Sequence, residues 1–222
     1  LLCFLWMSYF VLKNNYIYSD KFTIILGFLL LFRFLISQTY QISSGVWNIN
    51  HSLPLHLCGI SSILSIIILF RYNQTLYEYL VLLGAPGALW SFLTPEINIS
   101  EPFYMYVDYF ISHAAIIFVP LYLTVCLHKK PRLLSYLRIF IVMNIFVMPF
   151  VAIANIMIKN IFNSTAVNYM YLMHPPQAEN PFVTDGWMYM LVLEITAFAH
   201  MFLIYSIFIF ISKFRNKTNP RE

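Results

Sequence analysis

Long runs of hydrophobic residues, separated by short polar segments, dominate this chain. A hydrocarbon core about 30 Å thick needs about 20 mainly apolar residues for one helical crossing. The runs that meet or approach this length are 1–12, 22–41, 54–70, 76–93, 106–127, 137–159 and 187–212. Backbone amides in lipid must be satisfied within their own element, and the runs lack the alternation of barrel strands. The pattern predicts an all-α membrane bundle of about seven transmembrane helices, with a single domain over 1–212 and a basic tail at 213–222.

The composition strengthens this prediction. The 222 residues are 60 % hydrophobic and only 10 % charged, whereas a soluble domain has about 25 % charged residues. The net charge of +4 does not predict nucleic-acid binding, because the basic residues lie in the gaps between apolar runs. Cys3, Cys58 and Cys126 fall in three different runs, without the spacing of a disulfide framework or a zinc site. We therefore expect no metal and no other cofactor.

The distribution of basic residues predicts the orientation. All of the 13 Lys and Arg residues except Arg33 and Lys159 lie after the first, third and fifth predicted helices or in the tail. The positive-inside rule assigns these segments to the cytoplasm. We expect a multi-pass protein of the cell membrane with its N-terminus outside and its C-terminus inside, which requires an odd number of spans. The longest external loop, 160–186, is either a lid or an ordinary connector.

Several polar or reactive side chains fall at a similar depth, in the outer third of the predicted membrane. Ionisable groups in transmembrane helices are costly, so each of them is a candidate functional residue. This layer contains Arg33, His56, Cys58, His113, Asn155 and Glu194. Arg33 lies too deep to reach the interface easily, and Glu194 is its expected partner. Such a pair would be either structural or part of a substrate site.

Cys58 and His113 are the two members of this layer that are able to perform covalent chemistry. A thiol needs a base or a positive field to become a thiolate in a low-dielectric site, and imidazole is the usual base. A lone cysteine in an apolar helix is more commonly an inert small hydrophobic residue. The histidine at matching depth is what distinguishes Cys58. We expect His200 to be a structural residue and His128 an interfacial one.

The segment Gly-Ala-Pro-Gly-Ala at 84–88 interrupts the predicted helix 76–93. A proline inside a helix removes a backbone hydrogen bond, and glycines permit close approach of a neighbouring helix. The segment therefore predicts either a kink that opens a cavity or a tight helix contact.

Three motifs carry a resemblance to a known family. Leu53-Pro-Leu-His-Leu-Cys58 opens a predicted helix, Asp108-Tyr-Phe-Ile-Ser-His113 follows, and Asn168-Tyr-Met-Tyr-Leu172 precedes Pro175. In this order and spacing the chain resembles the YwaF-like bacterial integral membrane proteins, which are related to the eukaryotic transmembrane protein 164 acyltransferases.

The resemblance implies a transacylase or lipid acyltransferase that uses membrane phospholipids as acyl donor or acceptor. Cys58 and His113 would be the acyl-transfer pair, working through an acyl-thioester. Arg33, His56, Asn155 and Glu194 would then bind the substrate or stabilise its charge.

Two other functions are consistent with the same residues. The first is a transporter or small-ligand-binding membrane protein, in which Arg33, Glu194 and the histidines form an intramembrane polar site. The second is a structural subunit, which would leave the polar layer without a purpose. The position of Cys58 relative to His113 distinguishes these possibilities from acyl transfer.

Overall fold

The computed structural model describes residues 20–95, 102–176, 186 and 188–218, and within these ranges the protein is entirely helical. The predicted helix 1–12 lies outside the described residues. The helices and helical turns are α2 (Asp20–Ser43), α3 (Leu57–Phe70), α4 (Gln74–Tyr79), η2 (Leu80–Gly84), α5 (Ala85–Leu93), α6 (Phe103–Val125), α7 (Ser135–Val142), η3 (Met143–Val147), α8 (Met148–Phe162), η4 (Tyr169–Tyr171) and α9 (Met188–Thr218).

Five helices of the described chain are long and apolar enough to cross a membrane, which makes this a multi-pass membrane protein. They are Lys21–Ser43, Gln74–Leu93, Phe103–Val125, Ser135–Phe162 and Met188–Ser212. The second and fourth of these are composite, because α4, η2 and α5 run on as one helix, as do α7, η3 and α8. The remaining apolar helix, α3, has only 14 residues. The all-α prediction is confirmed.

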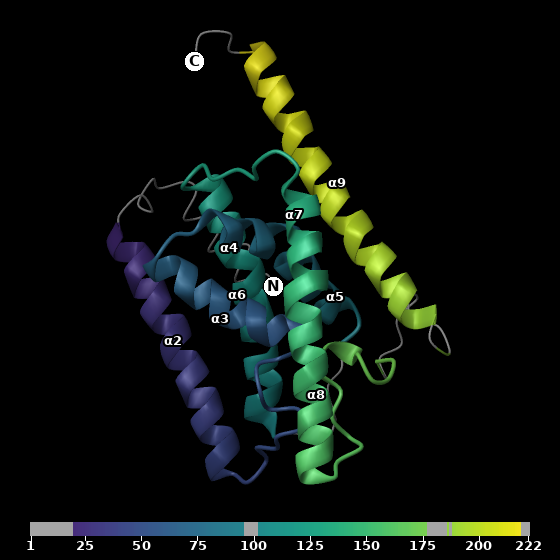
Figure 1. Ribbon diagram of the computed structural model, residues 1–222. Coiled ribbons are helices and arrows are strands. Elements are labelled where there is room, and N and C mark those ends of the chain that lie inside the picture. The colour runs from purple at the N-terminus through teal and green to yellow at the C-terminus, as the bar shows by residue number, and fades with distance from the viewer. Residues whose placement is uncertain (1–19, 96–101, 177–185, 187, 219–222) are drawn as a thin grey trace.

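The helices α4 to α6 form the centre of the bundle, and α2 and α9 lie at its periphery on different sides (Figure 1). Tyr77, Leu80 and Leu82 of the first composite helix are fully buried, and they belong to the same core cluster as Val119 and Leu123 of α6. Most side chains of α2 and α9 face outward and are apolar, as expected for lipid contact. The central helices therefore form the hydrophobic core, and the peripheral helices present apolar side chains to lipid.

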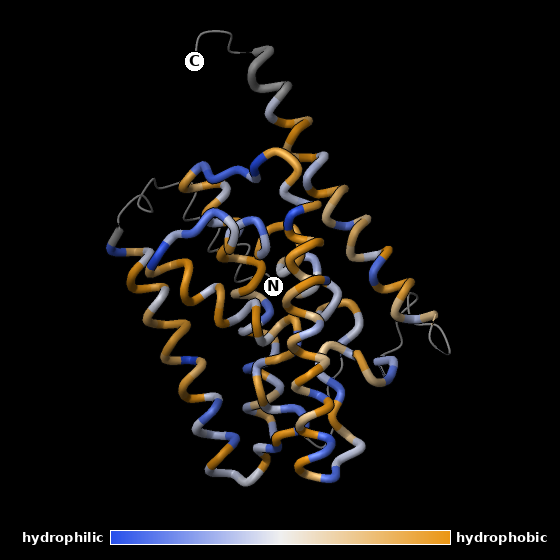
Figure 2. The backbone as a smooth tube through the Cα atoms, viewed as in Figure 1, coloured by the Kyte–Doolittle hydropathy of each residue, from blue (hydrophilic) through white to orange (hydrophobic). Residues whose placement is uncertain are grey.

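The basic connections gather at one end of the bundle. The loops that join α3 to α4 and α6 to α7 lie at the end toward which α9 runs (Figure 1), and the α6–α7 loop is strongly hydrophilic (Figure 2). These loops contain Arg71, Lys129, Lys130 and Arg132. We refer to this end as the basic end. That it faces the cytoplasm stays a prediction.

Both composite helices contain a widened turn just before a proline. In η2 the amide of Ala85 donates to the Leu80 carbonyl, and in η3 the amide of Met148 donates to the Met143 carbonyl. Pro86 and Pro149 follow these amides directly. A proline lacks the N–H that would continue the α-helical pattern, and a shift to i→i−5 bonding accommodates it. The segment 84–88 thus distorts its helix without ending it.

The glycines of the same segment let α3 approach closely. A Cβ atom on Gly84 would lie 3.1 Å from Ser61 Oγ, and one on Gly87 would lie 2.9 Å from Leu57 Cδ2. Both neighbours belong to the first half of α3. Distortion and close packing, which the sequence left as alternatives, therefore occur together.

Gly59 packs against Pro54 at the start of α3, and a substitution at Gly59 tests this contact. A Cβ atom there would lie 2.8 Å from the Pro54 Cα atom, which is backbone and cannot rotate away. We expect Gly59→Ala to lower the free energy of unfolding by about 1–3 kcal/mol through overpacking, measured by thermal unfolding in detergent micelles. Gly87→Ala is the matched control, because it meets only a flexible leucine tip. Equal stability of both variants would contradict the contact.

Candidate functional site

A cavity of about 1000 Å³ lies among the helices. Its walls come from the start of α3, the segment η2–α5, α6, α7–η3–α8 and α9, together with the chain before α3 and after α8. Most of its surface is apolar. The polar and reactive side chains that line it from the helices and from the residue before α3 are His56, Cys58, Trp90, Ser91, Tyr109, His113, Asn144, Tyr171, Tyr189, Glu194, Thr196 and His200. Both widened turns, η2 and η3, contribute residues to its walls.

Cys58 lines this cavity from the first turn of α3, where it is the second helical residue. Backbone amides in the first turn of an α-helix have no acceptor within the helix, and the helix dipole adds partial positive charge there. The side chain of His56, which directly precedes the helix, makes no capping hydrogen bond to these amides. A cysteine at this position lies in the kind of field that stabilises a thiolate.

His113 lines the same cavity from α6, and its side chain is almost completely buried, with the residue 3 % exposed. Its Nδ1 atom lies 2.7 Å from the Tyr109 carbonyl oxygen. A carbonyl only accepts, so Nδ1 carries the proton, and in the neutral ring Nε2 is left as the proton acceptor. The rings of Phe92 and Tyr109 contact the imidazole and hold its plane. His113 thus has the tautomer that a general base needs.

The other helical histidine at the cavity differs in this respect. His200 Nδ1 lies 2.7 Å from the Thr196 carbonyl oxygen, and Trp90 Nε1 donates to His200 Nε2 at 3.2 Å. Both ring nitrogens are therefore engaged, which fits the predicted structural role of His200.

His56 contributes a hydrogen-bond donor. Its Nδ1 accepts from the Met170 amide at 3.4 Å, so the neutral ring carries its proton on Nε2. The ring packs against the rings of Tyr169 and Tyr171, with centroids 5.1 and 5.4 Å away. His56 also lines the cavity, two residues before Cys58.

The structure corrects the predicted partner of Arg33. Its Nη1 atom donates to Asp108 Oδ1 at 2.7 Å and its Nη2 atom to Ser62 Oγ at 3.0 Å, while Ser37 Oγ donates to Asp108 Oδ2 at 2.8 Å. The expected Arg33–Glu194 pair is wrong. Arg33 is not among the residues that line the cavity.

Glu194 lines the cavity from α9 and accepts a hydrogen bond from Asn144 Nδ2 at 3.0 Å. Asn144 lies in the widened turn η3 and also donates to the Phe140 carbonyl oxygen at 3.1 Å. The carboxylate on the cavity wall is therefore hydrogen-bonded to one of the two helices that contain a widened turn.

Asn155 forms two hydrogen bonds with the chain that follows α8. Its Nδ2 donates to the Tyr169 carbonyl and its Oδ1 accepts from the Tyr169 amide, each at 3.0 Å. The Tyr169 hydroxyl donates to the Ile49 carbonyl at 2.7 Å and accepts from the Leu53 amide at 3.0 Å. Burial raises the pKa of the Tyr169 phenol, so it remains protonated at neutral pH. This network joins α8, η4 and the chain before Cys58.

Of the six residues predicted to form a polar layer, four line the cavity: His56, Cys58, His113 and Glu194. Arg33 and Asn155 are not among its lining residues. Sequence reasoning missed Asp108 and Asn144. A helix that begins at 106, as expected from the sequence, would have Asp108 in its first turn, but α6 begins at Phe103 and carries Asp108 deeper. An earlier helix start would have identified it as an ionisable residue in need of a partner.

Comparison with known families finds one family whose model matches nearly the whole chain. A model of the TMEM164 family matches residues 1–205 of the 222. No curated protein and no solved structure matches the chain. The matched range includes Cys58, His113, Glu194 and every other residue that lines the cavity. From this match over most of its length, the chain belongs to the TMEM164 family.

Proposed function

We propose that this protein is a membrane-embedded lipid acyltransferase in which Cys58 is the nucleophile and His113 the general base. The observation that carries this proposal is that both residues line one cavity, whose walls come largely from membrane-spanning helices. Cys58 belongs to the first turn of α3, and His113 presents an unprotonated Nε2. An apolar cavity with a few polar groups suits a lipid ester as substrate.

The reaction proceeds in two balanced steps. His113 takes the proton of the Cys58 thiol, and the thiolate attacks the carbonyl carbon of a phospholipid ester. The ester C–O bond breaks, the acyl group stays on sulfur as a thioester, and the departing alcohol takes the proton from His113. In the second step His113 removes the proton of an acceptor hydroxyl. That oxygen displaces the sulfur and the new ester is released. His113 then returns the proton to the sulfur, which restores the Cys58 thiol and the neutral imidazole.

The remaining predicted site residues take different parts in this proposal. The Nε2–H group of His56 and the first-turn amides of α3 are the candidate donors to the oxyanion that forms in each step. Glu194, held by Asn144, provides a polar wall for the substrate. Arg33 and Asn155, predicted to bind substrate, instead support α6 and the segment around Tyr169.

The finer family assignment is also part of this proposal. The motif Leu53–Cys58 and the histidine of Asp108–His113 support a place in the YwaF-like bacterial branch. Membrane phospholipids would be the acyl donor or acceptor, at the outer side of the cell membrane.

The alternative of a transporter or ligand-binding protein has one supporting observation, which is the Glu194 carboxylate on the cavity wall. That function was expected to use Arg33 together with Glu194. Because Arg33 binds Asp108 and does not line the cavity, the arrangement favours acyl transfer.

Intact mass spectrometry of the purified protein after incubation with phospholipid tests the proposal. We expect an added acyl mass on the wild type that hydroxylamine removes and that Cys58→Ala abolishes. Cys126→Ala is the matched control, since Cys126 is buried outside the cavity and should leave the adduct unchanged. An adduct that persists in Cys58→Ala, or acyl transfer at the wild-type rate in that variant, would overturn the mechanism.

A further inference from the structure

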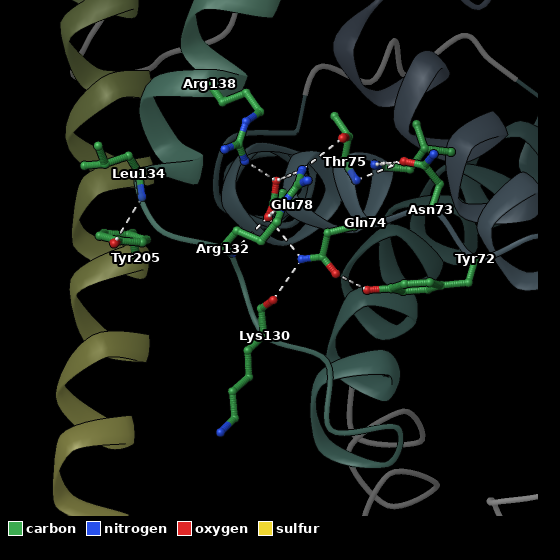
Figure 3. A network of polar contacts seen from close by, with 11 residues as sticks. Tyr72, Asn73, Gln74, Thr75, Glu78, Lys130, Arg132, Leu134, Arg138 and Tyr205 are labelled. Carbon is green, nitrogen blue, oxygen red and sulfur yellow. Dashed lines mark hydrogen bonds and ion pairs between the residues drawn. The ribbon is translucent and has the colours of Figure 1, made fainter.

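A second polar cluster lies away from the cavity, at the basic end of the bundle (Figure 3). Its centre is Glu78 of α4, whose side chain is completely buried. Arg132 donates to this carboxylate through its backbone amide at 2.8 Å, its Nε at 2.8 Å and its Nη2 at 2.9 Å. Arg138 Nη1 and Gln74 Nε2 donate at 3.2 and 3.0 Å. One carboxylate thus accepts from five donors, and its acceptor capacity is filled.

This arrangement leaves an excess of positive charge that is fixed in place. Glu78 carries one negative charge, whereas Arg132 and Arg138 carry one positive charge each. Their side chains remain 47 % and 41 % exposed. Arg138 uses only Nη1 for Glu78, through the longest of these bonds, so its Nε and Nη2 point to no acceptor among the described residues. The side chain of Lys130 extends away from Glu78 and adds further charge nearby (Figure 3).

The outer face of α7 beside Arg138 is apolar and exposed. Ile141 of α7 follows Arg138 at a spacing of three residues, which places it on the same face of the helix. Ile145 lies in the widened turn η3, about one turn further along. The two isoleucines are 50 % and 60 % exposed. Because α7 begins at the basic end and runs inward, this line passes from a guanidinium at the interface to aliphatic side chains in the hydrocarbon region.

A cation followed by an exposed apolar track matches the shape of a phospholipid, with its phosphate at the interface and its acyl chain along the helix. Guanidinium groups bind phosphate oxygens through two parallel hydrogen bonds, and Arg138 retains two N–H-bearing nitrogens for that purpose. A net negative headgroup is favoured because the cluster carries excess positive charge. Free phosphate would use the guanidinium but gain nothing from the isoleucines.

We propose that Arg138, with Ile141 and Ile145, forms a binding site for an anionic phospholipid on the outer face of α7 and η3, supported by the Glu78 cluster. This site is separate from the acyl-transfer cavity and does not depend on the proposed reaction. The lipid phosphate binds the free donors of Arg138, and an acyl chain lies along the two isoleucines. Glu78 and Arg132 fix the position of α7 against α4.

Native mass spectrometry of the protein released from micelles that contain phosphatidylglycerol tests this site. We expect Arg138→Gln to reduce the retained phosphatidylglycerol about fivefold, the change expected for one interfacial basic residue. Lys159→Gln is the matched control, because it removes one exposed positive charge at the end of α8, far from the basic end (Figure 1). Retention of phosphatidylcholine should be the same in all three proteins.

A second variant protects the test against loss of folding. Ile141→Ser with Ile145→Ser changes only exposed side chains and leaves the Glu78 cluster intact, and it too should reduce retention of phosphatidylglycerol. Wild-type retention in this double variant or in a folded Arg138→Gln protein would overturn the proposal. Displacement of the lipid by millimolar inorganic phosphate would also overturn it, since it would identify a headgroup site without an acyl track.

Discussion

Replacing His113 with asparagine is expected to slow acylation of Cys58 by about 10²–10⁴-fold, the usual contribution of a positioned general base. The asparagine amide retains a donor near the position of Nδ1, which bonds to the Tyr109 carbonyl in the native protein. It has no group that accepts the thiol proton. The rate of adduct formation, followed by quenched intact mass spectrometry, measures the change.

His200→Asn is the matched control for this prediction. His200 lines the same cavity, but both of its ring nitrogens are already engaged by Trp90 and the Thr196 carbonyl. We expect its acylation rate to remain close to that of the wild type. Equal slowing of the two variants would indicate that general disturbance of the cavity, and not loss of a base, causes the effect.

Replacing Glu78 with alanine should cause the largest loss of stability, about 3–5 kcal/mol, because it leaves charged groups without their partner. The buried carboxylate holds the guanidinium groups of Arg132 and Arg138 and the start of α4 together. The two arginines are partly exposed, so water offsets part of the loss and places the expected value toward the lower limit. Thermal and chemical unfolding in micelles measure the change.

Two further variants define what that result means. Glu194→Gln neutralises a carboxylate that accepts a hydrogen bond from Asn144 and borders the cavity, and we expect little change in stability. Adding Arg138→Gln to Glu78→Ala should recover part of the loss, because it removes an unpaired positive charge. Independent, additive effects of the two substitutions would show that the ion pair contributes nothing.

The helices could be predicted from the sequence because lipid imposes a length and an apolar composition on each crossing. The expected segment 22–41 corresponds to α2, Asp20–Ser43, and 76–93 corresponds to Gln74–Leu93. The structure differs at 54–70, where α3 begins only at Leu57. Residues 53–56 form a turn instead, and Pro54 packs against Gly59. Hydropathy alone does not separate an apolar turn from a helix.

The residues that form the candidate site could be predicted only in part. A rise of about 1.5 Å per residue gives the depth of a side chain along its helix, and both Cys58 and His113, which are expected at one depth, line the cavity. The direction in which a side chain points is harder to predict, because lipid is as apolar as the bundle core and the pattern does not mark the inward face. Arg33 and Glu194 are expected at one depth, but Arg33 binds Asp108 and Glu194 binds Asn144, so their predicted pairing is wrong.

The path of the chain after α8 could not be predicted from the sequence pattern either. Asn155 lies about two turns before the end of α8 at Phe162, yet it bonds to the backbone of Tyr169. The chain therefore turns back along the helix to the depth of the cavity. Irregular backbone at such depth is tolerated where protein buries it or a cavity adjoins it, and no periodicity in the sequence signals that return.

The shortness of α3 sets a requirement for any lipid that reacts at Cys58. Its 14 residues extend about 21 Å at 1.5 Å per residue, about 9 Å less than a hydrocarbon core of about 30 Å. α3 is also inclined to the long helices (Figure 1), so with its last turn near the basic end, its first turn lies at least that far from the opposite end of a bilayer-spanning bundle. A phospholipid that enters from that side must sink by at least this distance and carry its headgroup out of bulk water before its ester reaches the sulfur.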